Sequence, residues 1–326
     1  MTLTTVNPAL LDTQAQYTGF KNRIINGAMV IDQRNAGASV TPADSGYTLD
    51  RWQARLSQAS KFTVQQNAGA VTPPTGFTKY LGVTSSFAYS LLSGDYFGIG
   101  QQIEGFNTAD LGWGTASAQT ISISFWVRSS LTGTFSCALT NDFTRGYVDT
   151  FTVSTANTWE YKTITIAGDT SGTWATNNTS GVRLIFNLGV GSSQNATPDV
   201  WGSWVGWGVS GAQNVVSTNG ATFYITGVQL EKGSTATSFD YRPYGTELAL
   251  CQRYFESFII RLRSGIDGVT GTQRGTGYFK VTKRATPTIT GTVYSTITET
   301  TTDGFNLSRV NNPTDIDSPL GISAEL

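Results

Sequence analysis

The stretch GVQLEKGSTATSFDYRPYGTELALCQRYF (227–255) differs from the rest of the chain because charged, aromatic and helix-favouring residues are concentrated in it. Residues 222–230 alternate as a β-strand does, and the Glu-Lys-Gly that follows is expected to turn the chain. Pro243 favours an extended backbone before it, and the sequence 246–250 predicts a capped single turn of helix. The stretch is therefore predicted to join one β-domain to a second.

Six residues of this stretch are predicted to hold the junction together rather than to bind a ligand. Four are aromatic and should be largely buried, since each such ring removes about 150–250 Å² from water. Two are charged and should tie the crossing to both domains. The six are Phe239, Tyr241, Tyr244 and Tyr254, together with Arg242 and Glu247.

On both sides of the junction the sequence shows short β-strand patterns. Apolar and polar residues alternate in KFTVQQ, TISISFWVRSS, WEYKTITIAG, VRLIFNLGV and ATFYITGVQL, with turn residues between them. YTLDRWQARL (47–56) is likewise predicted to be a strand with one polar face. Many short strands without amphipathic helices predict an all-β protein, a jelly-roll β-sandwich followed by a smaller C-terminal β-domain.

The predicted division of the chain has four parts. Residues 1–19 form an arm, 20–245 the jelly-roll domain, 246–251 a short helical seam and 252–326 the C-terminal β-domain. In this last domain, strands are expected in RYFESFIIRL, GYFKVTK, TPTITGTVYST and GFNLSR, and a loop is expected at NNPTDIDSP (311–319).

Composition excludes several classes of function. Only 13% of the 326 residues are charged, about half of the roughly 25% that is typical of soluble proteins. With a net charge of −1 and no basic patch, nucleic acid is not an expected partner. No apolar run approaches the roughly 18 residues of a membrane span, and no signal-peptide pattern begins the sequence. We expect a soluble protein made in a host cytoplasm, with no membrane insertion.

The two cysteines, Cys137 and Cys251, are too far apart in sequence to form a motif. They are expected to be small buried residues, and one long-range disulfide is the alternative.

Several blocks of the sequence resemble a group of bacteriophage virion proteins, namely tail-fibre or receptor-binding proteins whose jelly-roll domain is similar to carbohydrate-binding modules. The resemblance implies a homotrimer that joins other virion proteins through residues 1–19 and binds a glycan of the host-cell surface. The blocks occur in order at 22–35, 47–52, 223–255, 283–290 and 322–326.

Carbohydrate-binding modules of this kind often hold a structural calcium through acidic residues near their first and last strands. The corresponding positions here, Ala28-Met29 and Thr226-Gly227, bring no carboxylate. Calcium takes six to eight oxygen ligands, usually including carboxylates. We therefore expect no metal at this place and no cofactor, while coordination by backbone oxygens elsewhere stays open.

An enzymatic role is not expected. Without histidine, the chain has no Ser-His-Asp or Cys-His arrangement and no imidazole metal site. A pair of carboxylates, as in glycosidases, is the remaining route, but the acids are scattered singly and predict no catalytic residue. The acids considered are Asp95, Glu104, Asp110, Asp142, Asp149, Glu160 and Asp169.

Tryptophans are the candidate carbohydrate-binding residues, because indole rings stack on the C–H faces of sugars. Two stand in loop-like sequence and should be exposed, and three recur in VWGSWVGWG (200–208), where packing inside the sandwich or between subunits is the alternative. A strand there would place the first and third on one face. The five are Trp113, Trp174, Trp201, Trp204 and Trp207. Trp52 and Trp126 lie in strand patterns and are expected in the core.

Two classes of function follow from these observations. The protein is expected to be a non-enzymatic trimeric tail fibre, located in the virion, that binds a host-surface glycan. The alternative is a structural virion component, such as a head-decoration protein or an adaptor fibre, without glycan recognition. A glycan-degrading enzyme is a weaker third alternative.

Overall fold

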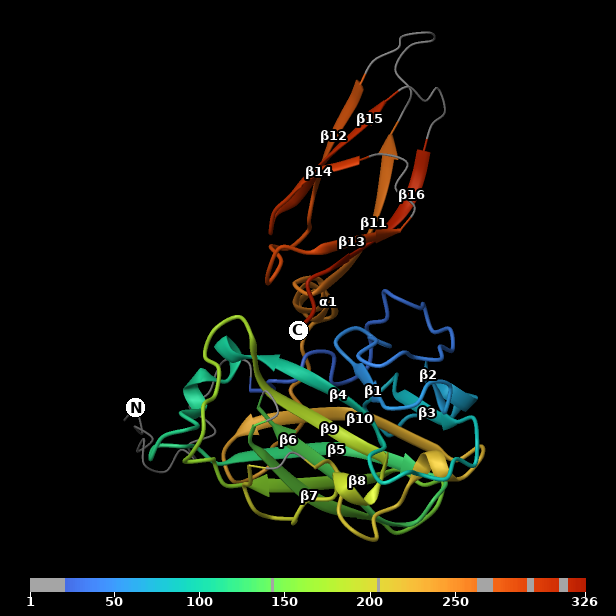
Figure 1. Cartoon of the computed structure of the whole chain (residues 1–326), viewed down its shortest axis with the longest axis vertical. Coiled ribbons are helices and arrows are strands. Elements are labelled where there is room, and N and C mark those ends of the chain that lie inside the picture. The colour runs from blue at the N-terminus through green and yellow to red at the C-terminus, as the bar shows by residue number, and fades with distance from the viewer. Residues whose placement is uncertain (1–20, 142–143, 204–205, 263–271, 292–295, 311–315) are drawn as a thin grey trace, which may run out of the picture.

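The protein consists of two β-structured parts joined by one short helix, as Figure 1 shows. This computed structural model describes residues 21–141, 144–203, 206–262, 272–291, 296–310 and 316–326. The fold is all-β, and it is a jelly-roll β-sandwich followed by a smaller β-domain, as predicted. The expected arm at 1–19 lies outside the described residues.

The sandwich consists of two five-stranded antiparallel sheets. The first has the order β1 (Gln53–Leu56), β4 (Tyr96–Glu104), β9 (Ser180–Val190), β6 (Gly133–Thr140) and β7 (Gly146–Val153). The second has the order β2 (Phe62–Gln66), β3 (Leu81–Ser85), β10 (Thr222–Lys232), β5 (Ile121–Ser129) and β8 (Glu160–Ile166). Most neighbouring strands are distant in sequence, as a jelly roll requires.

In the described part of the chain, five short 3-10 helices lie in the connections of the sandwich. They are η3 (Ala68–Ala70), η4 (Gly105–Asn107), η5 (Ala109–Leu111), η6 (Ser192–Gln194) and η7 (Val215–Ser217).

The core lies between the two sheets and follows from the alternation in each strand. The alternate apolar residues of β5 that point inward are fully buried, and its Phe125 ring lies 5.0 Å from the Phe151 ring and 4.9 Å from the Phe186 ring of the opposite sheet. Each buried ring contributes several kcal/mol at about 25 cal/mol per Å². The alternating segments quoted above form β2, β5, β8, β9 and β10, which confirms those predictions.

The predicted strand at 47–56 is only partly present. Strand β1 begins at Gln53, because the chain makes a tight turn in which the Trp52 amide donates to the Leu49 carbonyl and Arg51 adopts a φ of 69°. The expected polar face is also wrong, since the side chain of Arg51 is buried.

The smaller part contains two three-stranded sheets around a small apolar core. One has the order β11 (Phe255–Leu262), β16 (Ile316–Ser323) and β13 (Thr288–Gly291). The other has the order β12 (Thr272–Tyr278), β15 (Gly304–Val310) and β14 (Thr296–Thr300). The side chains between them are Phe279, Phe305, Leu307, Leu320 and Ile322.

Three sequence predictions in this part need correction. Strand β12 ends at Tyr278, so most of GYFKVTK follows the strand, and β16 begins at Ile316, inside the segment predicted as a loop. The Asp303 carbonyl accepts from the Phe279 amide, and the Thr302 carbonyl accepts from the Lys283 amide. At Phe279 and Lys283, these hydrogen bonds to a turn take the place of hydrogen bonds between neighbouring strands. In TPTITGTVYST the first strand is limited to β13, and residues 292–295 lie outside the described residues.

The helix at the junction is longer than predicted. Helix α1 spans Tyr244–Gln252, and Pro243 precedes it without a side-chain cap. Thr246 therefore lies inside the first turn rather than capping it. Proline is well suited to a helix start because its fixed φ is compatible with the turn and it lacks an amide donor.

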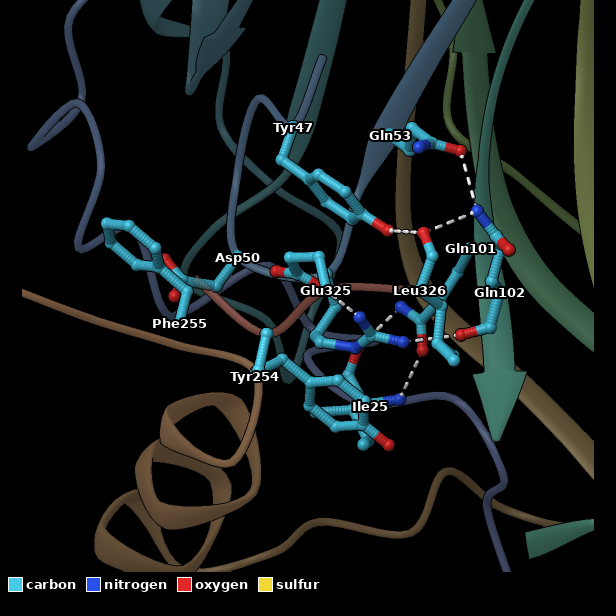
Figure 2. Close-up of polar contacts among 12 residues, drawn as sticks. Ile25, Tyr47, Asp50, Gln53, Gln101, Gln102, Tyr254, Phe255, Glu325 and Leu326 are labelled. Carbon is cyan, nitrogen blue, oxygen red and sulfur yellow. Dashed lines mark hydrogen bonds and ion pairs between the residues drawn. The ribbon is translucent and has the colours of Figure 1, made fainter. Parts of the chain in front are cut away.

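Glu325 and Leu326 lie against the sandwich (Figure 2), and Glu325 pairs with Arg51. The Arg51 Nη1 donates to Glu325 Oε2, its Nη2 donates to the Gln102 carbonyl, and its Cζ lies 3.5 Å from the centroid of the Tyr254 ring. The side chain is only 1% exposed. A buried guanidinium is costly unless it is paired and hydrogen-bonded, so these contacts, two of which come from the smaller part, make its burial tolerable.

Neighbouring groups hold the same segment from the sandwich side. Arg34 Nη2 lies 2.7 Å from Glu325 Oε1. The Tyr47 hydroxyl and the Gln102 amide each donate to the Leu326 oxygen, both at 3.0 Å. Burial raises the pKa of Tyr47 to about 12, so the hydroxyl remains a donor at neutral pH.

Two further ion pairs attach helix α1 and the residue after it to the sandwich. Arg253 donates to both oxygens of Glu104 at 3.0 and 2.7 Å, and the Tyr254 hydroxyl donates to the same carboxylate at 2.7 Å. Arg242 pairs with Glu247 at 3.3 Å and also donates to backbone carbonyls near the start of the sandwich. These contacts of Arg242 and Glu247 reach the sandwich, and a tie to both domains stays a prediction.

The predicted burial of the junction aromatics is only partly correct. Tyr254 is fully buried, and Phe239 is half-buried. Tyr241 and Tyr244 are 58% and 63% exposed, so the prediction is wrong for them. Tyr241 packs on the outer surface, where its ring lies 5.6 Å from that of Phe77, and Tyr244 is the first residue of α1.

Both cysteines are free and buried, as predicted. Burial raises the pKa of the Cys137 and Cys251 thiols, which makes them poor nucleophiles.

Replacing Glu325 by alanine tests whether the buried charge at Arg51 depends on this pairing. Glu325→Ala leaves Arg51 and Arg34 without their carboxylate, so the free energy of unfolding should fall by about 3–5 kcal/mol. Urea denaturation followed by tryptophan fluorescence measures this loss.

The matched control is Asp110→Ala, which removes the half-exposed partner of Arg23. Surface pairs contribute about 0–1 kcal/mol, so this variant should denature close to the wild type. Equal losses in the two variants would contradict the role given to Glu325.

Candidate functional site

Three tryptophans from three separate connections meet at one end of the sandwich. Trp113 follows η5, Trp174 lies between β8 and β9, and Trp201 lies between β9 and β10. The ring centroids are 4.8 Å apart for Trp113 and Trp174, 5.2 Å for Trp113 and Trp201, and 5.5 Å for Trp174 and Trp201. All three pairs are edge-to-face, which is a favoured geometry for aromatic rings. We call these residues the tryptophan cluster.

The indole N–H groups of the cluster bond within the protein. Trp113 donates to the Gln119 carbonyl at 2.8 Å, and Trp201 donates to the Ala167 carbonyl at 2.8 Å. Trp174 donates to Asp169 Oδ2 at 3.3 Å. These bonds fix the ring planes, so the ring faces rather than the N–H groups are what a ligand would meet.

An ion pair contacts the tryptophan cluster through the indole of Trp174. Arg145 donates to both oxygens of Asp169, at 2.8 and 2.6 Å, and Asp169 is 2% exposed. The hydrogen bonds to Asp169 raise the pKa of Arg145. Because Asp169 also accepts from Trp174, the ion pair holds the indole in place. Sequence reasoning named Asp169 only as a solitary acid and missed Arg145.

Gly114 allows the two loops to approach closely. Its φ is 83°, and a Cβ at this position would lie 2.6 Å from the Gly172 carbonyl oxygen and 3.3 Å from the Trp174 ring. Any side chain here would push the Trp174 loop away.

A pocket of about 200 Å³ opens beside the cluster. The indoles of Trp113 and Trp174 form its aromatic wall, and threonines supply hydroxyl groups that both donate and accept hydrogen bonds. Its lining is uncharged and consists of Thr108, Ala109, Gly112, Trp113, Thr115, Trp174, Ala175, Thr176 and Val182. The chemistry offered is stacking on an apolar ring face together with hydrogen bonds to hydroxyl groups.

The structure brings together three of the five tryptophans named from sequence. Trp113 is 7% exposed, so the expected exposed position is wrong, while Trp174 and Trp201 are half-buried. Trp207 is 4% exposed and packs elsewhere, 5.0 Å from the Tyr96 ring. Trp204 lies outside the described residues.

The strand considered for 200–208 is absent from the residues described there, so spacing does not decide which tryptophans share a face. Trp52 is a core residue, as predicted. Trp126 is not, because it lies half-buried on the outer side of β5 with its ring 5.4 Å from that of Tyr161.

The described acids among those considered from sequence are engaged by other groups of the protein. Asp149 faces Asp199 and Asp142 lies outside the described residues. The other pairings are Asp95 with Ser57 and Tyr89, Glu104 with Arg253, Asp110 with Arg23, Glu160 with Lys162, and Asp169 with Arg145.

Next to the cluster, Asp149 has an unusual environment. The Tyr147 ring, two residues away on β7, lies 5.1 Å from the Trp201 ring. Burial raises the pKa of Asp149 to about 6, and the charge of Asp199 acts in the same direction. Burial likewise raises the pKa of Asp50, at the Arg51 turn, to about 6.

Across the described ranges, no three residues of the types His, Cys, Asp and Glu gather as a group that could hold a metal ion. The part of the chain that the structure describes also contains no helix long and apolar enough to cross a membrane.

Comparison with protein families and with curated proteins finds no match to this sequence. Among solved structures, the neighbours are carbohydrate-binding modules with jelly-roll folds and a phage tailspike domain. The enzymatically active domain of bacteriophage CBA120 tailspike protein 4 is 13% identical, over 65% of this chain and 21% of that one, with a TM-score of 0.34. This chain thus spans about a fifth of that protein's length.

Two carbohydrate-binding modules are matched over nearly their whole length. A family 61 module in complex with β-1,4-galactotriose is 10% identical, over 66% of this chain and 100% of that one, with a TM-score of 0.33. A family 11 module of a cellulosomal cellulase of Clostridium thermocellum is 14% identical, over 62% and 99%, with a TM-score of 0.31. Scores this low identify neither a ligand nor a reaction for this chain.

The raised pKa of Asp149 predicts a pH dependence of stability. A carboxyl group with a folded-state pKa above its unfolded value favours folding fully below the unfolded pKa of about 3.9, and this contribution is lost as the pH rises through about 6. The protein should therefore be more stable at about pH 5 than at about pH 7.5.

Asp149→Asn should reduce this difference in stability between the two pH values. The part that remains should come from Asp50, whose pKa is also raised. The midpoints of urea denaturation at the two pH values measure this difference in stability. The pKa values of Asp95 and Glu160 are lowered, so these two carboxyl groups change the stability only at lower pH. An unchanged difference in the variant would contradict the assignment.

Proposed function

We propose that the chain is a non-enzymatic fibre protein of a bacteriophage virion that binds a host-surface glycan. The observation that carries the glycan part is the pocket of about 200 Å³ beside Trp113 and Trp174. The sequence resemblance to phage tail-fibre and receptor-binding proteins supports the virion part.

The chemistry of the pocket suits a sugar. The C–H face of a sugar ring can stack on an indole, and the hydroxyls of Thr108, Thr115 and Thr176 can exchange hydrogen bonds with those of the sugar. Pockets for drug-sized ligands measure about 300–1,000 Å³, so this smaller one suits one or two sugar units. Its uncharged lining favours a neutral sugar over an acidic one.

The absence of catalysis is part of the proposal. Among the described residues, the acids considered from sequence take part in ion pairs and hydrogen bonds with other groups of the protein, and Asp149 interacts with Asp199. A glycan-degrading enzyme therefore remains the weakest alternative.

A structural virion component is the second candidate, and one observation favours it. All three indole N–H groups of the tryptophan cluster already bond within the protein. Rings bonded in this way can serve only to pack one end of the sandwich. In a head-decoration protein or an adaptor fibre, the three tryptophans would need no other role.

Binding to an array of neutral, acidic and amino-sugar glycans separates the two candidates. The wild-type protein should bind neutral glycans, and Trp174→Ala should weaken binding by about tenfold or more, equivalent to about 1.4 kcal/mol. Trp174→Phe keeps an aromatic face and should restore most of the affinity.

Trp126→Ala is the matched control, because it removes a half-buried indole on the outer side of β5 that does not line the pocket. This variant should bind as the wild type does. No binding by the intact assembly, or equal binding by the Trp174→Ala variant, would favour the structural candidate.

The proposed fibre is a homotrimer. Its low content of charged residues, 13%, fits surfaces that are covered by other copies, because interface cores are depleted in charge. Light scattering on the purified protein should give a mass of three times 34.9 kDa. A stable monomer at micromolar concentration would contradict the fibre.

A further inference from the structure

The sheet β12-β15-β14 of the smaller part has one apolar and one polar face. Phe305 and Leu307 of β15 point to the small core and are 2% and 3% exposed. Alternate residues of the same strand therefore point outward. Among the outward positions, Asn306 and Gly304 lie at the middle of the sheet, with β12 on one side and β14 on the other.

A row of polar side chains crosses this outer face. Thr276 of β12 and Glu299 of β14 both face Asn306 in the register of the sheet. The Thr276 hydroxyl donates to Asn306 Oδ1 at 2.8 Å, and Asn306 Nδ2 donates to Glu299 Oε2 at 2.8 Å. Each bond fixes the orientation of the next group, so the row presents donors and acceptors in a set order.

A β-bulge puts the carboxylate into this row. The register of β14 against β15 shifts between Ile297 and Glu299. Without the extra residue, Thr298 would face Asn306. Bulges commonly re-aim a side chain next to a functional site, and here the bulge replaces a hydroxyl with a carboxylate opposite the amide.

An exposed aromatic ring lies two residues along the same face. Tyr278 is 76% exposed, and its partner in the register is Gly304, which offers no side chain to cover the ring. Glycine is also required there, because a Cβ on Gly304 would lie 2.4 Å from the Gly277 carbonyl oxygen. The ring therefore stands beside the polar row with an open flank.

These groups line a pocket of about 270 Å³, larger than the one beside the tryptophan cluster. Its lining residues are Thr276, Tyr278, Glu299, Thr301, Asp303, Gly304, Phe305 and Asn306. The lining contains two carboxylates and no lysine or arginine. An aromatic ring, an oriented amide and carboxylates match the C–H face and the adjacent hydroxyl groups of a sugar.

We propose that the Tyr278 pocket is a second saccharide-binding site, for neutral or amine-bearing sugars. Tyr278 stacks on the sugar ring, Asn306 donates to a ring hydroxyl, and Glu299 and Asp303 accept from hydroxyl or ammonium groups. Acidic sugars are repelled by the two carboxylates. The site does not require the tryptophan pocket to bind, and it would give each chain two contacts with a polysaccharide.

Calorimetric titration of the full chain tests the site with β-1,4-galactotriose, a glucosamine trisaccharide and a sialylated trisaccharide. The first two should bind and the third should not. Tyr278→Ala and Glu299→Gln should each weaken binding at this site by about tenfold, equivalent to about 1.4 kcal/mol. Both side chains are exposed, so circular dichroism should show unchanged folding.

The matched variant is Trp174→Ala, which alters the other pocket and should leave binding at Tyr278 unchanged. Loss of binding in Trp174→Ala alone would support the tryptophan pocket and overturn the second site. Failure of all three sugars to bind would also overturn the second site. Binding of the glucosamine trisaccharide alone, if salt abolished it, would overturn the site as well. The last result would show ionic attraction without recognition of a sugar.

Discussion

The burial of Arg51 is the constraint on which the arrangement of the two parts depends. Its guanidinium belongs to the sandwich, but the groups that compensate its charge include Glu325 and the Tyr254 ring of the smaller part. Burial alone lowers the pKa of Arg51, and the electrostatic interactions with Glu325, Tyr254, Tyr47 and Cys251 together raise it above its usual value. Since a buried charge without its partner is strongly destabilising, separating the two parts would expose or orphan this group.

The same requirement explains why residues far apart in sequence are used together at the junction. Glu104 on β4 binds both Arg253 and Tyr254. Arg284, between β12 and β13, donates to the Glu325 backbone at 2.8 Å and to the Asn178 carbonyl of the sandwich at 2.6 Å. Directional bonds of this kind fix an orientation that apolar packing alone would leave adjustable.

Different structural features form the two proposed sugar sites. In the sandwich, loops bring Trp113, Trp174 and Trp201 together, and the Arg145–Asp169 pair holds one of these rings. In the smaller part, regular strands carry the groups, and a bulge and a glycine adjust them. The first site therefore depends on loop packing, whereas the second depends on sheet register.

The sequence by itself determined the fold class and many strands, because a period of two with turn residues between has few alternatives once one face must be buried. It also indicated that residues 227–255 contain a strand and then a helix, which the structure places at β10 and α1. It did not indicate that Arg51 would be buried, that Tyr244 would be exposed, or that Trp113 would meet Trp201. Those outcomes depend on which distant segments become neighbours, and local alternation carries no information about partners across a sheet or between loops. Only the tertiary structure decided them.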